Sequence, residues 1–171
     1  MKKNIFFILI AAFMLAPWPV VYAYDSVNAD SEAMMIQTAD TASAPQLSAY
    51  GGAIGSVTAG DLFEVDMTGS TEDMIFRLLI TNADELIPNY RFMNLKVGIY
   101  VQTTDGGWEE LTMRGEGEQR PIYISMQGGA AEFTLPGGAN YKITIDKGCF
   151  YCYGIEKGTK GSVPVFYLET S

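Results

Sequence analysis

The sequence predicts an all-β protein: a single antiparallel β-sandwich of about nine short strands, jelly-roll or immunoglobulin-like. In residues 63–67 and 95–101 apolar and polar side chains alternate, the two-residue period of a strand buried on one face. Glycine is abundant, at 18 of 171 residues, and charged residues make up only 18%, which suits a protein with many tight turns. No strand-helix alternation appears, so a parallel α/β fold is not expected.

Residues 1–23 have the organisation of a secretory signal peptide. Lys2 and Lys3 precede an apolar run over residues 5–15, Pro17 interrupts it, and a cleavage site follows at Ala23. The apolar run is shorter than the ~20 residues that a membrane-spanning helix needs. We therefore expect a secreted protein, extracellular or at the cell surface, with no stable membrane span in the mature chain.

Residues 24–47 are rich in Ala, Ser, Thr and Asp and show no periodicity. This composition predicts a flexible leader or linker ahead of a β-sandwich domain over residues 48–171. An alternative is that residues 34–36 of the leader pair with a sheet edge of another molecule, as in donor-strand recognition.

The first part of the domain alternates apolar runs with turns. Residues 48–59 predict an edge strand, and residues 61–67 predict a strand buried on one face. Residues 74–80 are apolar on both faces apart from Arg77, which predicts a central strand covered on both sides. Residues 81–94 are expected to carry one helical turn and to cross between the sheets, with Tyr90 and Phe92 as plugs.

The second part of the domain carries two hairpin signals. Asp105-Gly106 lies between the predicted strands 95–103 and 108–113, and Gly128-Gly129 lies between 122–126 and 131–135. Further strands are predicted over 141–145, 149–153 and 162–169, with a turn at 146–148 separating the first two.

Charge and cysteine content limit the partners. Removal of Lys2 and Lys3 leaves 9 basic against 20 acidic residues, a net charge of −11. Nucleic acid and anionic membranes would be repelled, whereas cations, neutral glycans or basic proteins would not. Cys149 and Cys152 form a local disulfide only if the chain turns between them, because an extended strand holds them too far apart; buried thiols are the alternative.

The chain contains no histidine, which excludes Ser-His-Asp and Cys-His catalysis and histidine-ligated metals. A pair of carboxylates, as in glycoside hydrolysis, remains for an enzyme. The acidic pairs visible in the sequence are adjacent residues, which point to opposite faces of a strand. We therefore expect no catalytic residues and no enzyme.

Calcium is the one cofactor that the composition leaves open. It binds carboxylate and carbonyl oxygens, and six acidic residues could supply them if their loops converge: Asp61, Asp66, Glu72, Asp73, Asp84 and Glu85. No D-x-D-x-D-G loop is present, and the simpler expectation is that no cofactor binds.

Three aromatic residues fall at outward positions of the predicted strands: Tyr100, Trp108 and Tyr123. They would be neighbours if the strands 95–103, 108–113 and 122–126 lie side by side, and aromatic rings among polar groups suit a sugar-stacking surface. The alternative is that they pack against a loop or the second sheet.

The sequence thus predicts a secreted, non-enzymatic β-sandwich that acts as an interaction or assembly module at the cell surface or in the extracellular matrix, with a protein partner (itself or a cell-surface protein). The alternatives are a carbohydrate-binding module, with or without calcium, and a carboxylate-dependent glycan-cleaving enzyme.

Overall fold

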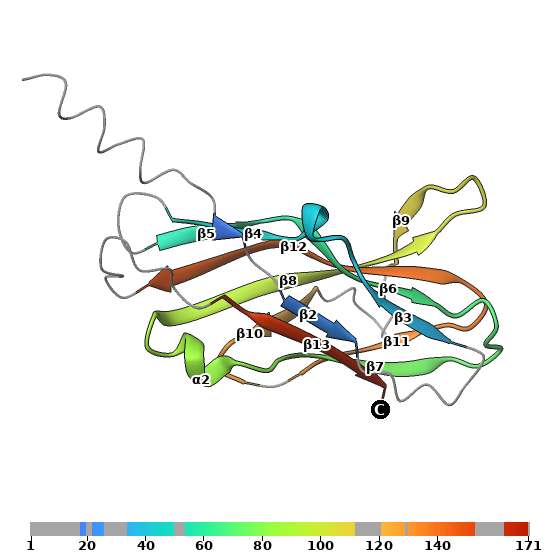
Figure 1. The fold of residues 1–171 in the computed structure, drawn as a ribbon. Helices are drawn as coiled ribbons and strands as arrows, with labels where there is room; N and C mark the ends of the chain where they lie inside the picture. The colour runs from blue at the N-terminus through green and yellow to red at the C-terminus, as the bar shows by residue number, and fades with distance from the viewer. Residues whose placement is uncertain are drawn as a thin grey trace, which may run out of the picture.

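The computed structural model describes residues 18–19, 22–25, 34–49, 54–111, 121–128, 130–152 and 163–170. Over these residues two β-sheets pack face to face (Figure 1), which confirms the all-β sandwich. Besides one short helix, α2 (Ala83–Leu86), and a 3₁₀ turn, η1 (Thr41–Ser43), the described elements are strands: β1 (Trp18–Pro19), β2 (Tyr22–Asp25), β3 (Met35–Thr38), β4 (Gln46–Ala49), β5 (Ile54–Thr58), β6 (Gly60–Asp66), β7 (Met74–Ile80), β8 (Tyr90–Gln102), β9 (Trp108–Glu110), β10 (Ile122–Ser125), β11 (Ala131–Leu135), β12 (Asn140–Cys152) and β13 (Val165–Thr170).

The larger sheet, sheet A, is built around two long antiparallel strands, β8 and β12, which pair along almost their whole length. The other side of β12 pairs with β6 and then with β5. Beyond these lie β3 next to β6, β4 next to β5, and β1 next to β4, while β9 and β10 pair with the free side of β8. Every pairing in sheet A is antiparallel.

The smaller sheet, sheet B, has the strand order β11-β7-β13-β2 and lies below sheet A in Figure 1. The core between the sheets consists of the inward residues that the alternation predicts, among them Phe63, Val65 and Ile99. Aromatic rings interlock within it: Tyr90 and Phe150 meet edge to face with centroids 5.5 Å apart.

The prediction of a flexible leader over residues 24–47 is wrong where these residues form strands: 24–25 in β2, 35–38 in β3 and 46–47 in β4. Met35–Thr38 pairs with β6 of the same chain, and Ile36 is buried in the core. The donor-strand alternative is corrected at the same point, because this segment completes its own sheet. Burial of the apolar Ile36 side chain in the core of the same chain is favourable relative to its exposure to water. Residues 26–33 of the predicted leader lie outside the described residues.

The second predicted hairpin is also wrong. Ile122–Ser125 pairs with β8 in sheet A, whereas Ala131–Leu135 pairs with β7 in sheet B, so the link between them crosses from one sheet to the other. The predicted turn at residues 146–148 is instead an irregularity in the pairing of β12 with β8. A bulge of this kind keeps the strand continuous while it bends.

Strand β7 has one buried and one solvent-facing side, contrary to the expectation that both are covered. Phe76 and Leu78 are in the core, whereas Ile75 on the other side is 44% exposed. The apolar sequence of β7 therefore does not mean that a further layer covers the outer face of sheet B.

The link from β7 to β8 carries the predicted helical turn, α2, and crosses between the sheets as expected. Asn82 stands at its start, but its side chain does not cap the helix. It bonds the start of β13 and the residues before it: it donates to the Val163 carbonyl and accepts from the Val165 N–H, both at 2.8 Å. Tyr90 is buried as predicted, while Phe92 is exposed. None of the helices in the described ranges has the length and apolarity to traverse a bilayer.

Candidate functional site

The outward face of sheet A carries a row of side chains that crosses five strands. Strand register places Met35 beside Asp66, and Asp66 beside Asn140. The Asn140 amide donates to Gln102 Oε1 at 3.0 Å, and Gln102 pairs with Trp108 on β9. The row therefore joins β3, β6, β12, β8 and β9 and ends on an indole ring.

A second row lies next to the first, two residues along each strand. Its members follow the same strand order: Gln37, Glu64, Lys142, Tyr100 and Glu110. Because side chains two residues apart in a strand share a face, the two rows together form one polar surface with an aromatic edge.

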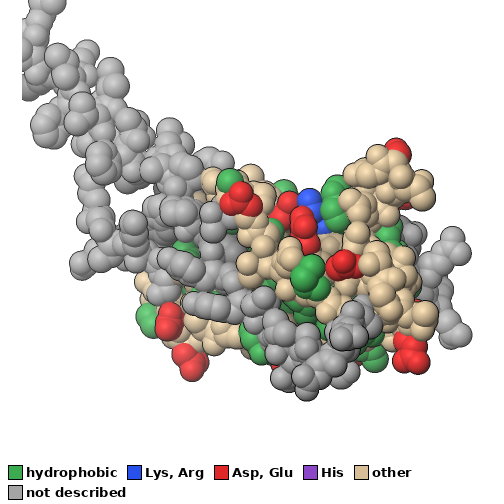
Figure 2. All heavy atoms as spheres, turned by 45° about the vertical axis from the view of Figure 1, so that its right-hand side comes forward, with side chains coloured by type: hydrophobic (Ala, Val, Ile, Leu, Met, Phe, Trp, Pro, Cys, Tyr) green, Lys and Arg blue, Asp and Glu red, His purple; other side chains and the backbone are tan. Residues whose placement is uncertain are grey.

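A groove of about 240 Å³ lies over these rows. It opens on the surface, and its walls combine amides, carboxylates, a methionine and an indole: Met35, Gln37, Glu64, Val65, Asp66, Gln102, Trp108, Asn140 and Tyr141. In Figure 2, basic (blue) and acidic (red) side chains adjoin one another in the upper part of the molecule. The groove is thus mostly polar, with its apolar contacts at the two ends.

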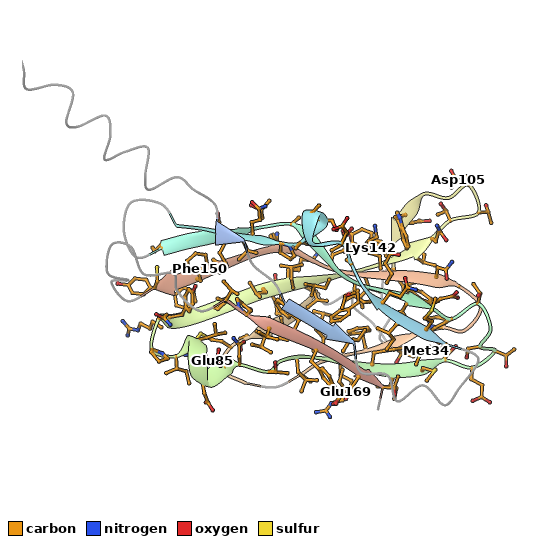
Figure 3. All side chains as sticks on the ribbon, viewed as in Figure 1. Met34, Glu85, Asp105, Lys142, Phe150 and Glu169 are labelled. Carbon is orange, nitrogen blue, oxygen red and sulfur yellow. The ribbon has the colours of Figure 1, made fainter. Side chains whose placement is uncertain are left out.

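Trp108 is held by a tight turn. The β8–β9 hairpin predicted from Asp105-Gly106 is confirmed, with Gly106 at φ 84°, a conformation that favours glycine. The tip, marked by Asp105 in Figure 3, projects beyond the sandwich. Trp108 at its base stays 37% exposed, so the ring combines a defined position with an accessible surface.

Lys142 fixes the ring from the side of β12. Its ammonium lies 4.6 Å from the centre of the Trp108 ring, a cation–π contact. The same ammonium forms an ion pair with Asp61 at 3.1 Å and lies 4.0 Å from Glu64. Figure 3 shows Lys142 on the outward side of sheet A. The positive charge of Lys142 is therefore already paired with carboxylates of the same chain.

Local hydrogen bonds stabilise the ionised form of Asp66. The Thr68 hydroxyl donates to Asp66 Oδ1 at 2.6 Å, and the Thr68 backbone N–H donates to the same oxygen at 2.9 Å. These bonds stabilise the carboxylate and lower the pKa of Asp66 below its usual 3.8. The groove thus contains a permanent negative charge at neutral pH.

The three aromatic residues predicted as a sugar-binding face do share the outward side of sheet A, but only Trp108 lines the groove. Tyr100 is half-buried, and its hydroxyl donates to Asp146 at 3.1 Å. Tyr123 on β10 is 50% exposed and stands opposite Lys96, four residues along β8 from Tyr100. The structure therefore does not bring the three rings into one platform.

The six acidic residues considered for calcium do not converge. Asp61 pairs with Lys142, and Asp66 is bonded by Thr68. Asp84 and Glu85 lie on α2, and Figure 3 shows Glu85 far from Lys142. Glu72 and Asp73 lie in the β6–β7 link. Among the described residues no group of three or more His, Cys, Asp or Glu side chains could hold a metal ion.

Cys149 and Cys152 are thiols and are not joined in a disulfide. Both lie on the extended strand β12, Cys149 exposed and Cys152 buried. Burial raises the pKa of the Cys152 thiol, which makes it a poor nucleophile.

The groove residues that the sequence did not single out are mainly the amides Gln37, Gln102 and Asn140. Alternation places Gln102 and Glu64 on the outward face, but it does not show which strands adjoin. Residues 35 and 108 become ends of one row only through the pairing of β3, β6, β12, β8 and β9.

No protein-family model and no curated protein matches this chain. Among solved structures it is similar to a pectin-binding carbohydrate-binding module, at 10% identity and a TM-score of 0.22, over 79% of this chain and 95% of the other. It is also similar to the Podospora anserina GH26-CBM35 β-(1,4)-mannanase, at 14% identity and a TM-score of 0.20, over 79% of this chain and 28% of that enzyme. Both TM-scores are low, so neither likeness indicates a function for this chain.

Proposed function

We propose that this protein is an exported, non-catalytic β-sandwich module that binds glycans in the groove beside Trp108. The observation that carries the proposal is the row Asp66–Asn140–Gln102–Trp108 across four strands. A sugar ring presents an apolar face and a rim of hydroxyls, so its site needs an aromatic surface next to hydrogen-bonding groups. The groove supplies both within one row of side chains across adjacent strands.

The shape of the groove suits part of a polymer. At about 240 Å³ it is smaller than the ~300–1,000 Å³ pockets that enclose whole drug-sized ligands. It crosses strands spaced about 4.8 Å apart, so a chain lying over it could continue beyond both ends. We therefore expect an oligosaccharide segment to bind, and a monosaccharide to bind only weakly.

The chemistry of the groove disfavours cleavage. A glycosidase needs one carboxylic acid that stays protonated until it donates its proton. Asp66 has a lowered pKa, which is the opposite of that requirement. Glu64 lies on the same strand and the same face, so the two carboxylates share one side of the groove and cannot flank a bond from opposite sides.

A role in assembly or in binding a protein partner is the second proposal, but no surface described above favours it. Its donor-strand version depended on residues 34–36 reaching another molecule, and β3 pairs with β6 instead. The groove gives glycan binding a defined place, and for that reason we prefer it.

The direct test is a glycan array probed with the mature chain, with and without calcium, followed by calorimetric titration of the strongest ligand. Once the predicted signal peptide, which includes Trp18 of β1, is removed, Trp108 is the remaining tryptophan, and its fluorescence should change on binding. Trp108→Ala should weaken binding tenfold or more, because it removes the stacking surface.

Tyr123→Ala is the matched control, since it removes an exposed ring of the same sheet face outside the groove. It should leave the affinity unchanged. An array without any bound glycan in either condition would overturn the proposed function, as would equal losses for Trp108→Ala and Tyr123→Ala.

A further inference from the structure

The groove carries a net negative charge, because one ammonium, that of Lys142, is shared between Asp61 and Glu64. Glu64 and Asp66 both line it, and Asp66 is held ionised by the two hydrogen bonds from Thr68. Glu64 is largely exposed, and its nearest basic partner, the Lys142 ammonium, is 4.0 Å away. Two carboxylates therefore face whatever occupies the groove.

The neighbouring cations are already engaged. Lys142 lies 3.1 Å from Asp61 and beneath the Trp108 ring. Lys96, further along β8, bonds Asp146 at 2.8 Å and Glu110 at 3.2 Å. Among the described residues that line the groove there is no lysine or arginine. An anionic ligand would thus meet two carboxylates, while the nearest ammonium, that of Lys142, is already shared between Asp61 and Glu64.

We propose, on the basis of the proposed glycan function, that the groove selects glycans by charge: it admits neutral and amine-bearing sugars and rejects uronic acids. The amides of Gln37, Gln102 and Asn140 can hydrogen-bond hydroxyls and acetamido groups without regard to charge. A uronate carboxylate, in contrast, would be placed within a few ångströms of Glu64 and Asp66.

The size of the effect follows from Coulomb's law. We take two like charges about 6 Å apart, in a medium whose effective dielectric constant lies between that of a protein surface and that of water. Their repulsion weakens binding on the order of tenfold. At ~0.15 M salt the Debye length is about 8 Å, so a contact of this range persists. An ammonium group on the sugar reverses the sign and should strengthen binding.

The test is a panel in which each backbone linkage is present in neutral, amine-bearing and uronate form, titrated by calorimetry at ~0.15 M salt. We expect amine-bearing forms to bind at least as tightly as neutral ones, and uronate forms about tenfold more weakly. Trp108→Ala should weaken the neutral and amine-bearing forms together, which separates stacking in the groove from general attraction of cations to an acidic protein.

The double variant Glu64→Gln with Asp66→Asn should bring the affinity for uronate closer to that for the neutral form. Its matched control is Glu109→Gln with Glu132→Gln, which removes the same charge from exposed residues that do not line the groove. The inference is supported if the Glu64→Gln, Asp66→Asn variant changes the ratio of uronate to neutral affinity and the control variant does not.

A uronate form that binds as tightly as its neutral counterpart overturns the charge selection while leaving glycan binding intact. Equal effects of the two double variants overturn it as well, because the total charge would then be the cause. If no member of the panel or the array binds, the proposed function itself fails and the inference with it.

Discussion

The carboxylate of Asp146 occupies the space that a side chain on Gly98 would fill. The two residues lie on the adjacent strands β12 and β8, and a Cβ atom on Gly98 would overlap the Asp146 carboxyl group and the Thr144 hydroxyl. With that space open, Asp146 accepts bonds from Lys96 at 2.8 Å, Thr144 at 2.8 Å and Tyr100 at 3.1 Å. A missing side chain on one strand thus permits a polar network on the next.

Gly98→Ala should destabilise the fold by about 1–3 kcal/mol, because the added methyl group forces the Asp146 carboxylate out of its network. Urea unfolding followed by circular dichroism measures this difference. Gly128→Ala is the control: a Cβ there meets open space, and its effect should be small. Equal stability of the two variants would contradict the overlap.

Asp146→Asn should reduce stability by on the order of 1–2 kcal/mol at neutral pH, because an amide replaces the charged partner of Lys96. Burial alone would raise the pKa of Asp146, but the hydrogen bonds from Lys96, Thr144 and Tyr100 outweigh it and lower the pKa below 3.8.

The direction of the pH dependence follows from that lowered pKa. The unfolded chain takes up the proton at a higher pH than the folded chain does, so the contribution of Asp146 is complete above the unfolded value and declines as the pH falls through 3.8 and below. The stability gap between wild type and Asp146→Asn, measured by urea unfolding, should therefore narrow in acid. A gap that widens there would contradict the network.

Tyr90→Phe should leave stability within about 0.5 kcal/mol of wild type, because the buried Tyr90 hydroxyl has no hydrogen-bond partner among the described residues. The ring contact with Phe150 is retained. Burial, with a smaller contribution from Cys152, raises the pKa of Tyr90 to about 12.

Wild type should therefore lose stability between about pH 10 and 12 relative to Tyr90→Phe, since the unfolded tyrosine ionises first. Chemical unfolding of both proteins across that range tests this. A large loss in Tyr90→Phe at neutral pH would show that the hydroxyl has a partner.

One thiol should react quickly in the native protein and a second only after unfolding. Cys149 is exposed on β12, whereas Cys152 is buried and its pKa is raised. Titration with a chromogenic disulfide reagent, with and without urea, counts them, and Cys149→Ser should abolish the fast phase. Absence of any thiol in the unfolded, unreduced protein would indicate a disulfide instead.

The sequence by itself determined which side of the alternating strands β6 and β8 faces the core. The alternation at Phe63, Val65, Leu95, Val97 and Ile99 predicts a buried side, and all five are buried. The Asp105-Gly106 turn was equally predictable, because its positive φ requires a residue such as glycine. These features are local, so a short window of sequence contains them.

Only the tertiary structure decided which strands adjoin. Residues 122–126 and 131–135 look like a hairpin but belong to different sheets, and Met35 joins the same row as Trp108 although 73 positions separate them. Backbone N–H and C=O groups are alike in every strand, so pairing and register depend on how the whole chain buries its apolar faces together. The groove is a product of that register, and no single segment encodes it.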